Sequence, residues 1–181
     1  MQMRVLLLSA IVGLATIGCD APSRGDPQAE LAAATNEADR FYALGPAAKR
    51  SFAAGAIDTA RSNAEELLVL APKFRGNWNY GNAIHDGNMI LGRVAAKSGK
   101  VEEAAQFLRA AGRTPGSPQL NTFGPNMSLA KDLLAKGQRT AVLEYFEACK
   151  RFWEMHDGRL DQWASQVRSG QEPQFGANLA F

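Results

Sequence analysis

Three glycines divide most of this chain into helical runs. From Gln28 onward, apolar residues recur three and four positions apart, and no segment alternates apolar and polar residues as a half-buried strand would. Glycines at positions 55, 99 and 137 each interrupt such an amphipathic run, and another helical run follows each of them. Glycine often ends a helix because it adopts the left-handed backbone conformation without steric strain. The pattern predicts an all-α domain at residues 28–181 that contains three helical hairpins.

Small or apolar residues stand at fixed distances from each of these glycines, on both helices of each predicted hairpin. Small side chains let two antiparallel helices approach to the short end of the usual range of about 8–10 Å. We therefore expect these positions to be buried, and Cys149 to be a small buried hydrophobe among them. At eight and seven positions before the glycine, and five and twelve after it, stand Ala47, Leu91 and Leu129; Ala48, Gly92 and Ala130; Ala60, Ala104 and Val142; and Leu67, Ala111 and Cys149.

The middle hairpin resembles a tetratricopeptide repeat. The resemblance lies in the segments 89–92 (MILG) and 98–105 (SGKVEEAA) and in Ala111, and Pro72 stands where the family has its terminating proline. It covers about residues 41–153, with glycine spacings of 44 and 38 residues where the family repeat has about 34. In place of the family's large aromatic residue in the first helix, the three units have Ser51, Ala95 and Leu133.

This resemblance implies a short α-solenoid of about three hairpins. The segment Leu160–Ser169 can form one more helix, with Trp163 and Val167 on its apolar face, and we expect it to cap the last hairpin.

The first 27 residues resemble an export leader and a tether. Arg4 precedes an apolar stretch, Val5–Ile17, that is shorter than the roughly 20 residues of a membrane-spanning helix. Thr16-Ile17-Gly18-Cys19 resembles the lipobox of bacterial lipoproteins, which implies cleavage after residue 18 and lipidation of Cys19. Residues 19–27 then form a tether. The implied location is the cell envelope, where the protein would be lipid-anchored and face the periplasm or the exterior. The sequence does not distinguish the inner from the outer membrane.

Composition narrows the classes of partner. Lysine and arginine total 20 against 18 aspartates and glutamates, a net charge of +2 that gives no footprint for nucleic-acid binding. With Cys19 acylated, Cys149 is the remaining thiol, so the fold is expected to have no internal disulfide. No cofactor is expected beyond the lipid on Cys19.

Two long connections are the most unusual segments chemically. Residues 73–81 (KFRGNWNYG) and 112–126 (GRTPGSPQLNTFGPN) each join one hairpin to the next, so in a solenoid they would emerge on the same edge as neighbours. Their aromatic and amide side chains suit stacking and hydrogen bonding. The alternative is that the aromatics plug the core and the asparagines cap helices. The candidate edge site consists of Trp78, Tyr80, Asn82, His85, Asn121, Phe123 and Asn126.

A second candidate is a row of basic residues. Lys49, Arg93 and Lys131 each stand six positions before a turn glycine. Because first helices line the concave groove in the tetratricopeptide family, the resemblance implies that this row could bind an acidic peptide or a carboxylate terminus. The alternative is that three solvated cations share an offset by coincidence.

The sequence holds no recognisable catalytic or metal-binding motif. His85 has no second ligand at a metal-binding spacing, and no nucleophile elbow, phosphate loop or dinucleotide fingerprint is present. The expected function is protein or peptide binding, or scaffolding, in the cell envelope, with enzyme activity left uncertain. One alternative is a small-ligand receptor or hydrolase with a pocket around His85, which requires His85 and Asn126 to face one concavity. Another is a structural accessory that uses its convex face.

Overall fold

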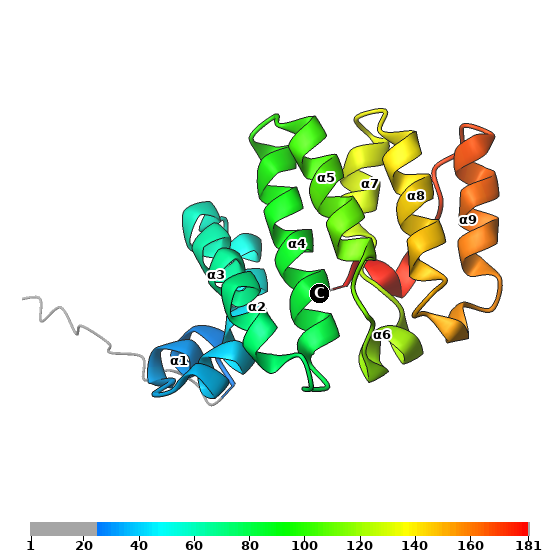
Figure 1. Cartoon of the computed structure of the whole chain (residues 1–181). Coiled ribbons are helices and arrows are strands. Elements are labelled where there is room, and N and C mark those ends of the chain that lie inside the picture. Colours follow the sequence, from blue (N-terminus) through cyan, green and yellow to red (C-terminus); the bar gives the residue numbers. More distant parts are fainter. Residues whose placement is uncertain (1–24, 181) are drawn as a thin grey trace, which may run out of the picture.

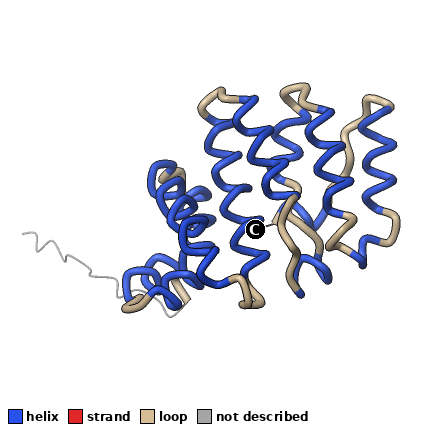
Figure 2. Tube along the Cα trace, viewed as in Figure 1, coloured by secondary structure: helices blue, strands red, loops and turns tan. Residues whose placement is uncertain are grey.

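The computed structural model describes residues 25–180, and this part of the chain is helical with no strand (Figures 1 and 2). The predicted leader and Cys19 lie outside the described residues. No helix within 25–180 is long and apolar enough to cross a membrane. Three short 3₁₀ helices occupy Ala71–Phe74, Glu154–His156 and Gly176–Leu179. The α-helices are α1 (Pro27–Ala33), α2 (Glu37–Ala53), α3 (Ile57–Leu70), α4 (Tyr80–Lys97), α5 (Val101–Gly112), α6 (Pro118–Phe123), α7 (Ser128–Leu134), α8 (Arg139–Cys149) and α9 (Arg159–Arg168).

The three predicted turns are confirmed. Gly55, Gly99 and Gly137 join α2 to α3, α4 to α5 and α7 to α8, and each has a φ between +76° and +79°. After each glycine, the next amide donates back across the turn to a carbonyl in the helix that has just ended: Ala56 to Ser51, Lys100 to Ala95, and Gln138 to Leu133. This hydrogen bond satisfies a carbonyl that the helix end leaves unpaired, so all three hairpins close by the same device. Figure 1 shows the paired helices side by side.

The residues at fixed offsets from the glycines are buried, as the pattern predicts. Gly92 shows why small residues are needed there. A Cβ atom on Gly92 would lie 2.2 Å from Cδ2 of Leu129, so α4 and α7 touch with no room for a side chain. Cys149 is likewise fully buried, and burial raises the pKa of its thiol.

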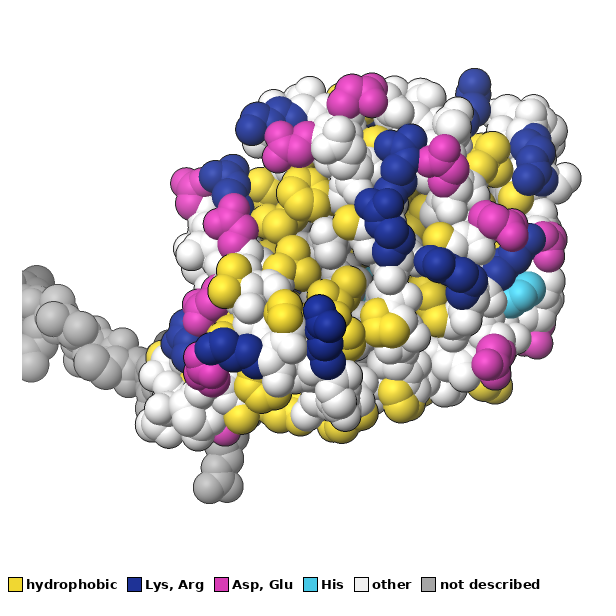
Figure 3. Space-filling model, in the orientation of Figure 1, with side chains coloured by type: hydrophobic (Ala, Val, Ile, Leu, Met, Phe, Trp, Pro, Cys, Tyr) yellow, Lys and Arg dark blue, Asp and Glu magenta, His cyan; other side chains and the backbone are white. Residues whose placement is uncertain are grey.

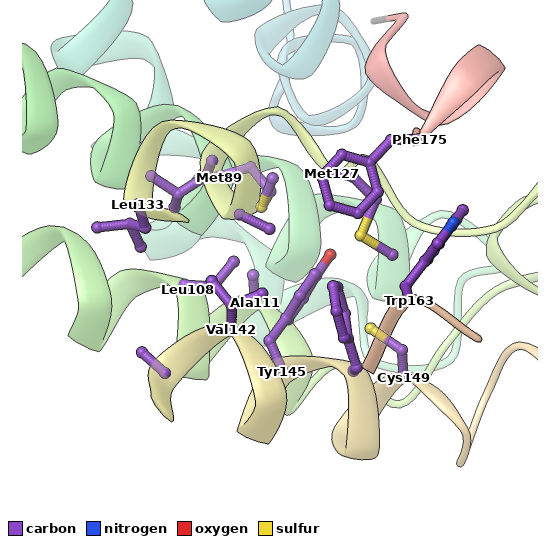
Figure 4. Packing of buried hydrophobic residues seen from close by; sticks show 14 of the residues in the cluster. Met89, Leu108, Ala111, Met127, Leu133, Val142, Tyr145, Cys149, Trp163 and Phe175 are labelled. Carbon is purple, nitrogen blue, oxygen red and sulfur yellow. The ribbon is translucent and has the colours of Figure 1, made fainter. Parts of the chain in front are cut away.

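The predicted capping helix is α9. Trp163 and Val167 face inward from it, and both are buried in the largest hydrophobic cluster. The C-terminal segment adds Phe175, whose ring meets Trp163 edge to face at 5.1 Å between centroids. Figure 4 shows this cluster, with Tyr145 pointing its hydroxyl into the space between α8 and Met127.

The second long connection contains a helix that we did not expect. The sequence predicts a long connection at residues 112–126, and α6 occupies Pro118–Phe123 within it. Ser117 caps α6 by accepting a hydrogen bond from the amide of Leu120 at 3.0 Å, and Pro118 occupies the first helical position. Serine followed by proline is a standard helix start, so the signal was present in the sequence.

The two long connections lie side by side, as predicted. The Thr114 hydroxyl donates to the carbonyl of Gly81 at 2.7 Å. A Cβ atom on Gly81 would lie 1.7 Å from the carbonyl oxygen of Gly116, so the two backbones are in direct contact. This contact fixes the start of α4 against the segment that leads into α6.

Residues 123–127 (FGPNM) and 175–179 (FGANL) hold each other through hydrogen bonds. Asn178 Nδ2 donates to the carbonyls of Phe123 and Pro125, each at 3.1 Å. Asn126 Nδ2 donates in return to the carbonyl of Ala180 at 2.8 Å. The C-terminal segment is thereby fixed beside the loop between α6 and α7.

We expect Gly81→Ala to lower the free energy of unfolding by about 1–3 kcal/mol, because a methyl group there overlaps backbone that has to move. Gly76→Ala, in the same connection, is the matched control, since no atom lies within 4 Å of its Cβ position. Urea denaturation of both variants measures the difference. Equal stabilities of the two variants would show that the backbones of the two connections can move apart without an energetic cost.

Candidate binding groove

Two adjoining hollows form one groove on the side of the molecule where α2, α4 and α6 meet. Their volumes are about 290 Å³ and about 360 Å³. Lys49, Asn82, Asp86 and Gln119 line both, and we call the joined hollows the groove. The second hollow ends at Ala180, so the fixed C-terminal segment supplies part of its wall.

An ion pair crosses the centre of the groove from α2 to α4. Lys49 Nζ lies 2.6 Å from Asp86 Oδ2. Burial on its own would raise the pKa of Asp86, but the charge of Lys49 and the hydrogen bond with His85 outweigh it and hold that pKa below its ordinary value. Asp86 is therefore a carboxylate at neutral pH, and the pair contributes no net charge to the groove.

His85 connects this ion pair to the interior. Its side chain is 1% exposed. The Nδ1 atom lies 3.2 Å from Asp86 Oδ1, and the Nε2 atom lies 3.0 Å from the Tyr145 hydroxyl. That hydroxyl donates to the carbonyl of Asn126 at 3.0 Å, and burial raises the pKa of Tyr145 well above its ordinary value, so the hydroxyl keeps its proton.

Both ring nitrogens of His85 are thus held by neighbouring side chains. A hydrolase would need a nucleophile or a water-activating group within reach of a basic nitrogen. The neighbours are instead a carboxylate and a phenol, and both serve to hold the ring. The geometry suits a histidine that supports the groove from below.

Exposed aromatic side chains gather at the groove. Tyr42 is 39% exposed, Trp78 53% and Phe123 74%, and all three line the hollows. Among the described residues, two other large hydrophobic side chains, Val69 and Met155, are exposed to this extent. The rings of Tyr42 and Trp78 lie 5.9 Å apart at 30° and form one end of the groove, which we call the aromatic platform.

The predicted edge residues divide between the groove and the framework. Trp78, Asn82, His85, Phe123 and Asn126 line the hollows. Two others are framework residues, in line with the structural alternative. Tyr80 packs against the hydrophobic cluster of α2, α3 and α4, and the Asn121 side chain accepts a hydrogen bond from the amide of Glu154.

His85 and Asn126 face the same hollow, which is the condition that the small-ligand interpretation requires. The Asn126 carboxamide is already engaged at both ends, because its oxygen accepts from the amide of Ser128 and its nitrogen donates to Ala180. It lines the wall without offering an unused group.

The predicted basic row is interleaved with acidic residues. Arg93 Nε donates to Asp132 at 3.0 Å, and its guanidinium lies 4.5 Å from the centre of the Phe52 ring. Lys131 is exposed on α7, next in sequence to Asp132. With Lys49 paired to Asp86, an acidic ligand would have to compete with an aspartate at two of the three positions. Charges of both signs are also interspersed over the face that Figure 3 draws.

Sequence reasoning missed Tyr42, Asp86 and Gln119. Gln119 lies in the second long connection, a segment already singled out, and Asp86 directly follows the candidate residue His85. Nothing local distinguishes Tyr42 from any aromatic residue on a core helix. Its role depends on where the first connection places Trp78.

We expect Asp86→Asn to lower the free energy of unfolding at pH 7 by about 1–3 kcal/mol, because it leaves Lys49 without its partly buried partner. A carboxylate whose folded-state pKa is depressed stabilises the fold above its unfolded pKa of about 4 and loses that contribution as the pH falls through the folded value.

The difference between wild type and Asp86→Asn should therefore shrink below about pH 4. Urea denaturation from pH 7 to pH 3 measures it, with Asp58→Asn as the exposed control. A difference that stays constant across this range would contradict the ion pair.

The described residues hold no group of three histidine, cysteine, aspartate or glutamate side chains that could bind a metal ion. Comparisons with protein-family models, with curated proteins and with solved structures find no match for this chain.

Proposed function

We propose that this protein is an exported, lipid-anchored module that binds an extended segment of a partner protein in the groove. The observation that carries the proposal is the gathering of exposed aromatic residues at the hollows, where solvent would otherwise be expected to meet polar side chains. Exposed aromatic anchors are typical of surfaces that bind other proteins.

A tetratricopeptide-like arrangement is part of this proposal. Three hairpins closed at equivalent glycines, with small buried residues at equal offsets, support it. The groove is lined by α2 and α4, which are the first helices of their hairpins, and first helices line the concave groove in that family, which supports the proposal.

A small-ligand receptor or hydrolase is the second candidate, because His85 and Asn126 line one hollow. We rank it lower, since the ring nitrogens of His85 and both ends of the Asn126 carboxamide have partners within the protein.

Selection of peptides from a random twelve-residue display library tests the proposal, with the purified full chain as bait. We expect enriched peptides to bind wild type and to lose about tenfold or more in affinity to Trp78→Ala and Phe123→Ala, because each change removes an aromatic anchor. Val69→Ala and Met155→Ala are matched controls, since both remove an exposed hydrophobic side chain outside the groove. Failure to enrich any peptide that depends on Trp78 would argue against the proposal.

Attachment to the envelope is tested separately at Cys19. We expect the wild-type chain to fractionate with membranes and to carry diacylglycerol and amide-linked acyl chains at Cys19 by mass spectrometry. Cys19→Ala should abolish both, because the acyl chains are the proposed anchor. Cys149→Ala is the control, since that thiol is buried within the fold. Equal membrane association of the Cys19→Ala protein would rule out the lipid anchor.

A further inference from the structure

The carboxamide and carboxylate oxygens in the centre of the groove each accept a hydrogen bond or ion pair from the protein, whereas several donors there have no partner among the residues that the structure describes. The side-chain oxygens of Asn79 and Gln119 both accept from Asn82 Nδ2, at 2.9 and 3.2 Å. The oxygen of Asn82 accepts from the Ser117 hydroxyl at 2.5 Å. The Asp86 carboxylate is taken by Lys49 and His85, so each carboxamide or carboxylate oxygen in the centre of the groove already has a protein partner.

Several side-chain donors in the groove, by contrast, have no acceptor in the described part of the protein. Within the described residues, neither Asn79 Nδ2 nor Gln119 Nε2 donates a hydrogen bond to a protein group, although both side chains line the groove. The Tyr42 hydroxyl accepts from Asn77 Nδ2 at 2.5 Å, which leaves its own proton to donate. A ligand that offers carbonyl oxygens and few N–H or O–H groups therefore fits this set of side chains.

The Tyr42 ring of the aromatic platform is held in place by its neighbours in the protein. The bond from Asn77 fixes the Tyr42 ring at its hydroxyl, and Phe41 contacts the same ring edge to face at 5.6 Å between centroids. Trp78 lies beside it with half of its surface exposed. A held tyrosine ring beside a half-exposed tryptophan ring suits flat, rigid apolar groups that lose little entropy on binding.

The charges in the groove exclude an ionic ligand at its centre. Lys49 is the cation and Asp86 the anion that line both hollows, and they already pair with each other. A charged ligand group would lose its hydration and would meet an ion pair whose two charges already offset each other. The central part of the ligand is therefore uncharged.

From these observations we infer that the groove recognises an uncharged, proline-rich segment of a partner polypeptide in the polyproline II conformation. Proline lacks an N–H group and keeps its carbonyl, and its ring is a rigid apolar surface. Polyproline II segments dock onto aromatic-lined grooves because they are already extended and ordered. A saccharide suits the groove less well, because its hydroxyl protons would have to share oxygens that already accept from the protein. The inference rests on the proposed peptide-binding function and names its ligand class.

Isothermal titration calorimetry of the full chain with acetyl-(Pro)10-amide tests the inference. We expect binding to this peptide, and binding at least tenfold weaker to an uncharged Gly-Ser peptide of equal length. Trp78→Ala should lower the affinity for the proline peptide about tenfold or more, because it removes one of the two rings of the platform. Met155→Ala should leave its affinity unchanged.

The donor argument has its own variant. Gln119→Glu keeps the shape of the side chain and the oxygen that accepts from Asn82, but it replaces the NH₂ donor with a second oxygen. We expect it to lower the affinity for the proline peptide severalfold. Gln171→Glu, on the exposed segment after α9, should leave that affinity unchanged. Equal affinities for wild type and Gln119→Glu would overturn the donor argument.

Failure of the inference is distinguishable from failure of the proposed function. If library peptides that depend on Trp78 contain acidic residues or lack proline, peptide binding stands and the proline-rich class is wrong. Binding of a chitin oligosaccharide that is lost in Trp78→Ala, without binding of the proline peptide, would replace the peptide by a glycan and overturn both.

Discussion

Helix α4 is the constraint on which the rest of the structure depends. At three of its glycines a side chain would collide with a different neighbour: Gly81 with Gly116, Gly87 with Leu68 of α3, and Gly92 with Leu129 of α7. The same helix contributes residues to all three hydrophobic clusters. A helix that is buried on nearly every side has little surface left for function. Part of what remains open to solvent lines the groove, and this is where Asn82 and Asp86 lie.

The polar residues that α4 contributes to the surface of the groove are thus among those that its packing leaves partly open to solvent. His85 shows how closely packing and groove are connected, because its ring is buried while it holds the Asp86 carboxylate at the floor of the groove. The opposite ring nitrogen meets Tyr145, which belongs to the largest hydrophobic cluster. A polar network that runs from the surface into an apolar core needs partners for its polar groups, and here they lie within hydrogen-bond distance of one another from Lys49 to the carbonyl of Asn126.

The fold could be predicted further than the site, for a physical reason. Gly55, Gly99 and Gly137 act locally, since each ends a helix by its own backbone conformation, and the burial of Ala48 or Ala130 follows from helical periodicity. Site residues depend on contacts between distant segments. Trp78 and Phe123 could be selected because long connections carry them, but the partner ring of Tyr42 and the ion pair of Asp86 with Lys49 exist only once α2 packs beside α4. Pairing of this kind leaves no trace in either segment alone.

The reciprocal asparagine contacts between residues 123–127 and 175–180 also govern how the molecule opens. They join the two ends of a stretch that contains α7, α8 and α9, so these helices are enclosed between segments that are bonded to each other. Local fluctuations free single elements where few long-range contacts cross them, whereas a stretch tied at both ends opens cooperatively. We therefore expect helices α7 to α9 to open together with the α4 and α5 residues of the largest cluster, and separately from the α2–α3 end of the molecule with its smaller clusters. The groove lies at the boundary between these two parts, and a segment bound across it would couple their motions.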